Sequence, residues 1–310
     1  MKSVTDALVG YETIILKKGL FNMKQRIIFG LLCAAAGILA LCIRNTPLFL
    51  VIGAIVCVMV AVEINKAIGL KNKPMFALSL VVAALVPVYY EYGYLLDGFA
   101  FNLSPVYLIC LYILALFILM LTGYENTRFS DVGMVLLGSL GLPLAVTILL
   151  YLRDIDKFFP EKNYTTEHGL FLILFAMFCA WISDASAYFG GRFFGKHRLA
   201  PKISPKKTIE GVISGTLGCI LANLILYAVF DNLVFAEPNN NYLVIIIMSI
   251  SLSLIGVCGD LTFSALKRNY EIKDFSNLVP GHGGVMDRFD SEVFVLVTLY
   301  ATINIFGVVI

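Results

Sequence analysis

Long apolar runs separated by short polar segments dominate this chain. Crossing a bilayer takes about 20 mostly apolar residues, in a helix that satisfies its own backbone hydrogen bonds. A window of that length predicts nine spans, at about 27–43, 48–64, 75–90, 105–123, 133–152, 169–189, 211–230, 242–259 and 292–310. The pattern therefore predicts an all-α, polytopic integral membrane protein.

The predicted spans divide the chain into three parts. Residues 1–26 form an N-terminal segment, residues 27–152 a bundle of five spans, and residues 153–310 a region of four spans. The last region contains two longer polar loops, 190–210 and 260–291. The first span has no convincing cleavage site, so we expect it to be retained rather than removed as a signal peptide. Met23, which precedes Lys24-Gln25-Arg26 and the first apolar run, is an alternative start.

Composition agrees with a lipid environment. Hydrophobic residues make up 59% of the 310 residues and charged residues 14%, whereas soluble domains carry about a quarter charged residues. The net charge of +2 is too small to favour a nucleic-acid partner. All seven cysteines fall in apolar stretches without metal-ligand spacing, so we interpret them as reduced, small hydrophobic residues.

Basic residues give the orientation. If the N-terminus is cytoplasmic, 19 of the 23 Lys and Arg residues fall in inner segments and 4 in outer segments. Cytoplasmic loops carry this excess in membrane proteins. We therefore expect both polar loops, and any site that they form, to face the cytoplasm. The compact chain favours a bacterial plasma membrane, with endoplasmic or mitochondrial membranes left open.

Acidic residues are placed at one membrane surface. Glu63, Asp184 and Asp260 lie near the inner ends of their predicted spans, and Asp287 and Asp290 precede the last span. An i, i+3 spacing puts the last two on one face if a helix begins there. A carboxylate in a membrane helix marks a candidate functional site, and carboxylate oxygens suit Mg²⁺. The alternative for each acid is a helix cap or a pair with a nearby cation.

The loop 190–210 holds six cations with glycines at 190, 191 and 195, and the run Ser204–Gly211 adds hydroxyls and further charge. Exposed backbone N–H groups, hydroxyls and cations are the groups that bind polyphosphate. The alternative is a basic collar that contacts anionic lipid headgroups. Headgroup attraction needs neither the glycines nor the detailed Ser204–Gly211 run, so we favour the phosphate interpretation.

The loop 260–291 is the stronger candidate. Its Pro280–Gly284 run is a compact turn that exposes backbone N–H groups to a ligand. Asp287-Arg288-Phe289-Asp290 then combines acids that suit a metal with a guanidinium that suits phosphate. This composition is unusual for a purely structural connection.

This run resembles the signature of the phosphatidate cytidylyltransferases, S-x-x-K-R-x4-K-D-[FY]-[GSA]-x2-[LIF]-[PG]-x-H-G-G-x-x-D-R-x-D. The polar and glycine positions that match are Ser264, Lys267, Arg268, Lys273, Asp274, His282, Gly283, Gly284, Asp287, Arg288 and Asp290. Val279 departs from the pattern by a conservative apolar change. The likeness extends to 184–188, 204–211 and Gly259-Asp260, so it covers the C-terminal half strongly and the N-terminal spans by topology.

The resemblance implies the reaction of CTP with phosphatidate to give CDP-diacylglycerol and pyrophosphate, with Mg²⁺ or another divalent cation. It implies metal ligands at Asp260, Asp287 and Asp290, which with Lys267 and Arg288 form the expected catalytic set. The expected substrate-binding residues are Asp184, Tyr188, Ser204, Lys207, Thr208, Glu210, Ser264, Arg268, Lys273, Asp274, His282, Gly283 and Gly284. Expected partners are CTP, phosphatidate and membrane lipids, without nucleic acid; a homodimer is left open.

Three alternatives remain at this stage. A CTP-dependent polyprenol-type lipid kinase would use similar groups, but the complete signature favours the cytidylyltransferase. A secondary transporter would carry its acids near the midplane and show inverted repeats, whereas these acids gather at one surface. A degenerate scaffold would be expected to lose acids from the signature, and all of them are present.

Overall fold

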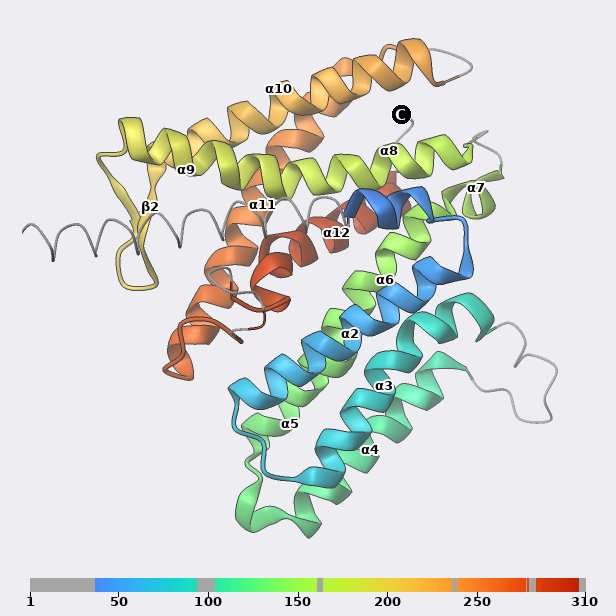
Figure 1. Ribbon diagram of the computed structural model, residues 1–310, viewed down its shortest axis with the longest axis vertical. Coiled ribbons are helices and arrows are strands. Elements are labelled where there is room, and N and C mark those ends of the chain that lie inside the picture. The colour runs from blue at the N-terminus through green and yellow to red at the C-terminus, as the bar shows by residue number, and fades with distance from the viewer. Residues whose placement is uncertain are drawn as a thin grey trace, which may run out of the picture.

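The computed structural model describes residues 37–93, 104–160, 164–235, 239–276, 278 and 283–306. Within these ranges, eight helices are long and apolar enough to cross a membrane. They coincide with eight of the predicted spans, and the predicted span 27–43 lies mostly outside the described residues. The prediction of an all-α, polytopic membrane fold is confirmed (Figure 1).

The N-terminal half is a helical bundle. Its elements are α2 (Pro47–Ala67), α3 (Lys73–Tyr92), α4 (Pro105–Thr122), the 3-10 turn η2 (Tyr124–Asn126), α5 (Phe129–Leu136), η3 (Leu137–Gly141) and α6 (Leu142–Arg153). The turn η3 is π-helical and joins α5 and α6 into one span. The backbone hydrogen bonds of η3 join residues five apart, and with this wider turn the span continues through Pro143 without a break.

The C-terminal half contains four more spans and a small hairpin. Its elements are α7 (Ile155–Phe158), α8 (Thr166–Met177), η5 (Phe178–Ile182), α9 (Ser183–Phe194), β1 (Arg198–Ala200), β2 (Ser204–Thr208), α10 (Ile209–Leu233), α11 (Tyr242–Asn269) and α12 (Met286–Phe306). A second π-helical turn, η5, joins α8 and α9 just before Asp184. The antiparallel strands pair Arg198 with Thr208 and Ala200 with Ser204.

Local sequence explains where the helices begin. Pro47 and Pro105 stand at the start of α2 and α4, where the missing N–H has no helical partner in any case. Thr208 caps α10, because its hydroxyl accepts a hydrogen bond from the Gly211 N–H at 3.1 Å. This cap fixes the end of the hairpin against the start of α10, and so places β2 beside the membrane helices.

The helix α6 connects the two halves. It packs against α2 and α3 on one side and against α8 and α12 on the other. The largest group of buried side chains includes Phe171, Tyr227, Ile245 and Leu299, which come from α8, α10, α11 and α12. Apolar side chains along α4 and α10 are instead exposed. In a membrane protein these exposed faces contact lipid.

Both polar loops are shorter than the sequence predicts. α9 continues to Phe194, α11 continues to Asn269, and α12 begins at Met286. A hydropathy window ends a span at its first charged residues, but helical hydrogen bonds continue beyond the apolar part of the helix. Asp260, Ser264, Lys267 and Arg268 are therefore helical, and what remains of the loop 190–210 contains the hairpin, which the sequence analysis did not predict.

Candidate active site

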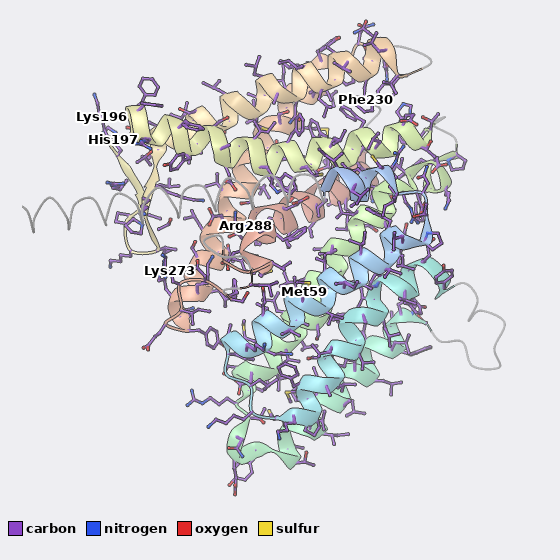
Figure 2. All side chains as sticks on the ribbon, viewed as in Figure 1. Met59, Lys196, His197, Phe230, Lys273 and Arg288 are labelled. Atoms are coloured by element: carbon purple, nitrogen blue, oxygen red, sulfur yellow. The ribbon has the colours of Figure 1, made fainter. Side chains whose placement is uncertain are left out.

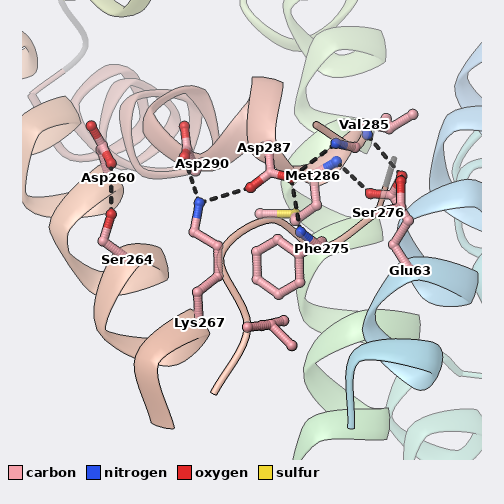
Figure 3. A network of polar contacts seen from close by, with 12 residues as sticks. Glu63, Asp260, Ser264, Lys267, Phe275, Ser276, Val285, Met286, Asp287 and Asp290 are labelled. Carbon is pink, nitrogen blue, oxygen red and sulfur yellow. Dashed lines mark hydrogen bonds and ion pairs between the residues drawn. The ribbon is translucent and has the colours of Figure 1, made fainter. Parts of the chain in front are cut away.

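Polar contacts join α2, α9, β2, α11 and α12 at one end of the bundle. Asp287 lies at their centre, in the first turn of α12, and is 7% exposed. Its Oδ2 accepts hydrogen bonds from the N–H groups of Phe275 and Gly284, both at 2.9 Å. Its Oδ1 accepts from Lys267 Nζ at 2.7 Å (Figure 3). Asp287 thus holds both ends of the segment 275–284 while it neutralises a lysine.

Lys267 is buried between two signature acids. Its ammonium contacts Asp287 and lies 3.8 Å from Asp290 Oδ2, and Figure 3 shows it between the two carboxylates. It also lies 5.5 Å from the centre of the Phe275 ring. The helix α12 begins at Met286, before the predicted span, and so meets the condition under which the sequence places Asp287 and Asp290 on one helix face. Lys267 therefore forms ion pairs with both acids.

Asp260 forms a second acid–lysine pair. Its Oδ2 contacts Lys207 Nζ of β2, and its Oδ1 accepts from Ser264 Oγ at 3.1 Å. The preceding Gly259 allows α11 and α12 to approach closely, since a Cβ there would lie 2.7 Å from the carbonyl oxygen of Asp290. The missing side chain brings Asp260 and Asp290 into the same neighbourhood.

Asp184 reaches this neighbourhood from α9. Its Oδ2 accepts a hydrogen bond from Ser291 Oγ at 3.2 Å. It is also close enough to interact electrostatically with Asp260, Lys207 and Arg288. Arg288 is exposed at the start of α12. The two lysines and this arginine therefore surround a group of carboxylates that come from three helices.

Glu63 is a site residue whose role the sequence does not indicate. Its side chain projects from α2 and is 4% exposed. Its two oxygens accept hydrogen bonds from Ser276 Oγ and from the N–H groups of Val285 and Met286. The one signal in the sequence is an acid near the end of an apolar span, which marks a candidate without naming its partner.

Glu210, a predicted site residue at the start of α10, contacts the segment that follows α9. Its carboxylate accepts hydrogen bonds from the N–H groups of Lys196 and His197 and contacts His197 Nδ1 at 2.6 Å. Tyr188 contacts Arg192 at 3.3 Å. Figure 2 shows Lys196 and His197 beside the end of α9, where the hairpin begins. Glu210 thus closes the connection between α9 and α10, while Ser204 begins β2 and Thr208 ends it.

The remaining predicted residues that the structure describes lie at the end of α11 and in the segment before α12. Arg268 donates to the carbonyl oxygen of Ile272 at 3.0 Å, and Lys273 and Asp274 are exposed. Figure 2 shows Lys273 beyond the end of α11. Gly283 has a φ of 84°, a conformation that favours glycine. His282 lies outside the described residues, so its predicted role as a ligand contact stays a prediction.

The donor set fits a divalent cation only if other ligands complete it. Among the residues that the structure describes, no three carboxylate, histidine or cysteine side chains are grouped so that they could hold a metal by themselves. Mg²⁺ in nucleotide sites is usually held by one or two carboxylates together with substrate phosphates and water. Asp260 and Asp290 fit that arrangement, and Asp287 Oδ1 keeps a lone pair beyond its bond to Lys267.

Comparison with known proteins shows the family to which the chain belongs. A model of the cytidylyltransferase family matches residues 24–306. The chain is 31% identical to a phosphatidate cytidylyltransferase of Bacillus subtilis over 92% of its own length and 99% of the relative's length. Over 132 residues it is 44% identical to the phosphatidate cytidylyltransferase of Staphylococcus epidermidis and 45% identical to that of Haemophilus influenzae, with less than half of each chain covered. The chain therefore belongs to the cytidylyltransferase family.

Proposed function

We propose that this member of the cytidylyltransferase family is a phosphatidate cytidylyltransferase. An oxygen of the phosphatidate phosphate would form a bond to the α-phosphorus of CTP. The bond from that phosphorus to the bridging oxygen of the β-phosphate would break, and its electron pair would leave on pyrophosphate. The observation that carries the proposal is the meeting of Asp184, Asp260, Asp287 and Asp290 with Lys207 and Lys267 at one end of the bundle.

The lysines of this site are suited to phosphate. Lys207 and Lys267 each form an ion pair with a carboxylate. These ion pairs position the two ammonium groups where the triphosphate would bind. Arg288 is exposed beside Asp184 and adds a guanidinium, which can contact two phosphate oxygens at once. Positioning and charge neutralisation dominate catalysis of such transfers, because little covalent help is needed.

Asp260 and Asp290, with the free lone pair of Asp287, would hold the divalent cation. Such an ion, when bound, stabilises negative charge on the phosphates and on the leaving pyrophosphate. Asp287 itself has a further task, since its hydrogen bonds to Phe275 and Gly284 hold the segment 275–284. A phosphate monoester has a second pKa of about 6 and is mostly dianionic near neutral pH. The attacking group therefore needs no strong general base from the protein.

The site would face the cytoplasm of a bacterial plasma membrane. The charge bias of the loops supports this side. The acyl chains of phosphatidate would stay in lipid. The phosphate group of phosphatidate would enter the site at the level of Asp184 and Asp260, between α9 and α11.

The test is a transfer assay with purified protein in mixed micelles. It would receive CTP labelled in the cytosine ring, phosphatidate and Mg²⁺, and label would be followed into the organic phase. We expect a labelled CDP-lipid, with release of one pyrophosphate for each molecule formed. A parallel reaction with γ-phosphate-labelled CTP and a polyprenol should give no labelled lipid. Absence of the CDP-lipid, or a labelled prenyl phosphate in its place, would overturn the proposal.

A further inference from the structure

We infer that Glu63 positions Asp287 and the start of α12 for the transfer proposed above, on which this inference depends, without contacting substrate itself. Glu63 lies on α2 in the N-terminal bundle, 213 residues before its first partner in the signature run. The residue is 4% exposed, and both of its carboxylate oxygens accept hydrogen bonds. Burial of a carboxylate costs folding free energy unless hydrogen-bond donors surround it. The contacts of Glu63 therefore compensate for its burial and fix its position.

Glu63 and Asp287 both accept hydrogen bonds from two short segments of the signature run. In the first segment, the Phe275 N–H donates to Asp287 at 2.9 Å and the neighbouring Ser276 hydroxyl donates to Glu63 at 2.6 Å. In the second segment, the Gly284 N–H donates to Asp287 at 2.9 Å. The next two N–H groups, at 285 and 286, donate to Glu63, both at 2.8 Å (Figure 3). The two carboxylates therefore fix both ends of the turn between them.

The contacts of Glu63 also complete the start of α12. The first N–H groups of a helix have no partner within the helix, and α12 begins at Met286. Glu63 supplies an acceptor for the Val285 and Met286 N–H groups from another helix, and its negative charge suits the positive end of the helix dipole. Asp287 is the next residue along α12. Any shift of this helix start would move Asp287 away from Lys267.

Gly284 shows how closely the carboxylate is fitted. A Cβ at Gly284 would lie 2.5 Å from Glu63 Oε2 and 2.6 Å from Oε1, and its three nearest atoms all belong to Glu63. The glycines with positive φ in the described chain are Gly69 and Gly283, so Gly284 has a backbone that alanine can adopt. A glycine of the signature is thus required here by the acid on α2, and not by its own backbone conformation.

The consequence is that a side chain of the N-terminal bundle contributes to catalysis by positioning the start of α12. The first test compares Glu63→Gln with Asn65→Ala. Asn65 is equally buried on α2, and its amide donates to Ser79 Oγ within the bundle at 2.6 Å. Glutamine keeps the shape of Glu63 but places an amide N–H donor against one of the backbone donors. We expect Glu63→Gln to lower kcat/KM for CTP about tenfold or more, and Asn65→Ala to change it less than about twofold.

The split between kcat and KM separates positioning from loss of folded protein. A smaller folded fraction lowers the maximal rate and leaves both KM values unchanged. A displaced Asp287 and Arg288 would also raise KM for CTP, while KM for phosphatidate would change less. The inference is overturned if the wild type is active and Glu63→Gln matches Asn65→Ala, or if Glu63→Gln lowers the maximal rate alone. An inactive wild type would instead refute the proposed function.

A double-mutant cycle tests the fit directly. Gly284→Ala should lower kcat/KM about tenfold or more in the wild type, because the added methyl displaces the carboxylate. In the Glu63→Ala background the methyl has room, so the same change should cost less than about twofold further. Equal losses in the two backgrounds would contradict the contact. The cycle still decides if Glu63→Gln is poorly expressed, since it compares Gly284→Ala within each background.

Discussion

Two charged clusters lie at opposite ends of the helical bundle, and they differ in how their charges are matched. At the end away from the site, Arg153 of α6 contacts Glu91 at 2.6 Å and Asp154 at 2.5 Å, and Lys157 contacts Asp154 at 2.9 Å. At the site end, Lys207 and Lys267 serve Asp260, Asp287 and Asp290, with Asp184 nearby. The first cluster has as many cations as acids, whereas the second has an excess of acids.

The two clusters differ in whether their side chains are accessible to a substrate. Arg153 is 7% exposed, and its guanidinium donates hydrogen bonds to Glu91 and Asp154, so this cluster joins α3 to α6 as a structural contact. In the site cluster, Asp260 and Lys207 are each 22% exposed and come from different elements. In the proposed function, incoming phosphates and a divalent cation would exchange partners with these residues without breaking the fold.

The largest effect on activity should come from Asp260→Asn. The amide keeps the size of the side chain but removes a charge that would hold the metal and pair with Lys207. We expect the transfer rate to fall at least about a hundredfold, with the thermal midpoint in detergent close to that of the wild type. Full activity of this variant would show that the site cluster is no more functional than the distant one.

Arg153→Met should give the opposite pattern. Removing one member of a buried ion pair leaves its acids uncompensated and costs about 3–5 kcal/mol of folding free energy. We expect a clearly lower thermal midpoint but normal kcat per folded molecule. A lower kcat with unchanged stability would mean that the distant cluster contributes to catalysis, and the distinction between the two ends would be lost.

Lys207→Gln should have an intermediate effect. The hairpin would still form, since Thr208 caps α10 through its own hydroxyl, but Asp260 would lose its cation and the triphosphate one contact. We expect kcat/KM for CTP to fall about tenfold, measured from initial rates at limiting CTP. An unchanged value would remove β2 from the substrate-binding surface.

The smallest effect should come from Lys202→Gln, the matched control for Lys207→Gln. Lys202 is exposed on the turn between β1 and β2. We expect kcat/KM for CTP to change less than about twofold. If both lysine variants lost activity equally, the hairpin would act through its total charge on lipid headgroups, the alternative that the sequence left open.

The sequence predicted the eight described spans because each apolar run is long enough to cross a bilayer alone. It also grouped Asp260 with Asp287 and Asp290, since the last two lie in the signature and the resemblance extends to Gly259-Asp260 ahead of it. It could not predict the pairs Lys207–Asp260 and Glu63–Met286, which join residues far apart in the chain and depend on how helices pack. The strand β2 was missed because Ser-Pro-Lys-Lys-Thr has little strand propensity outside its pairing with β1.

The central claim is that the acids at the site end hold a divalent cation only together with the nucleotide. Binding of Mn²⁺ to the purified enzyme, followed by electron paramagnetic resonance with and without CTP, tests this claim most directly. We predict weak binding to the enzyme alone, at least about tenfold tighter binding with CTP, and loss of that gain in Asp260→Asn. Equal affinity with and without CTP, or an undiminished gain in Asp260→Asn, would contradict it.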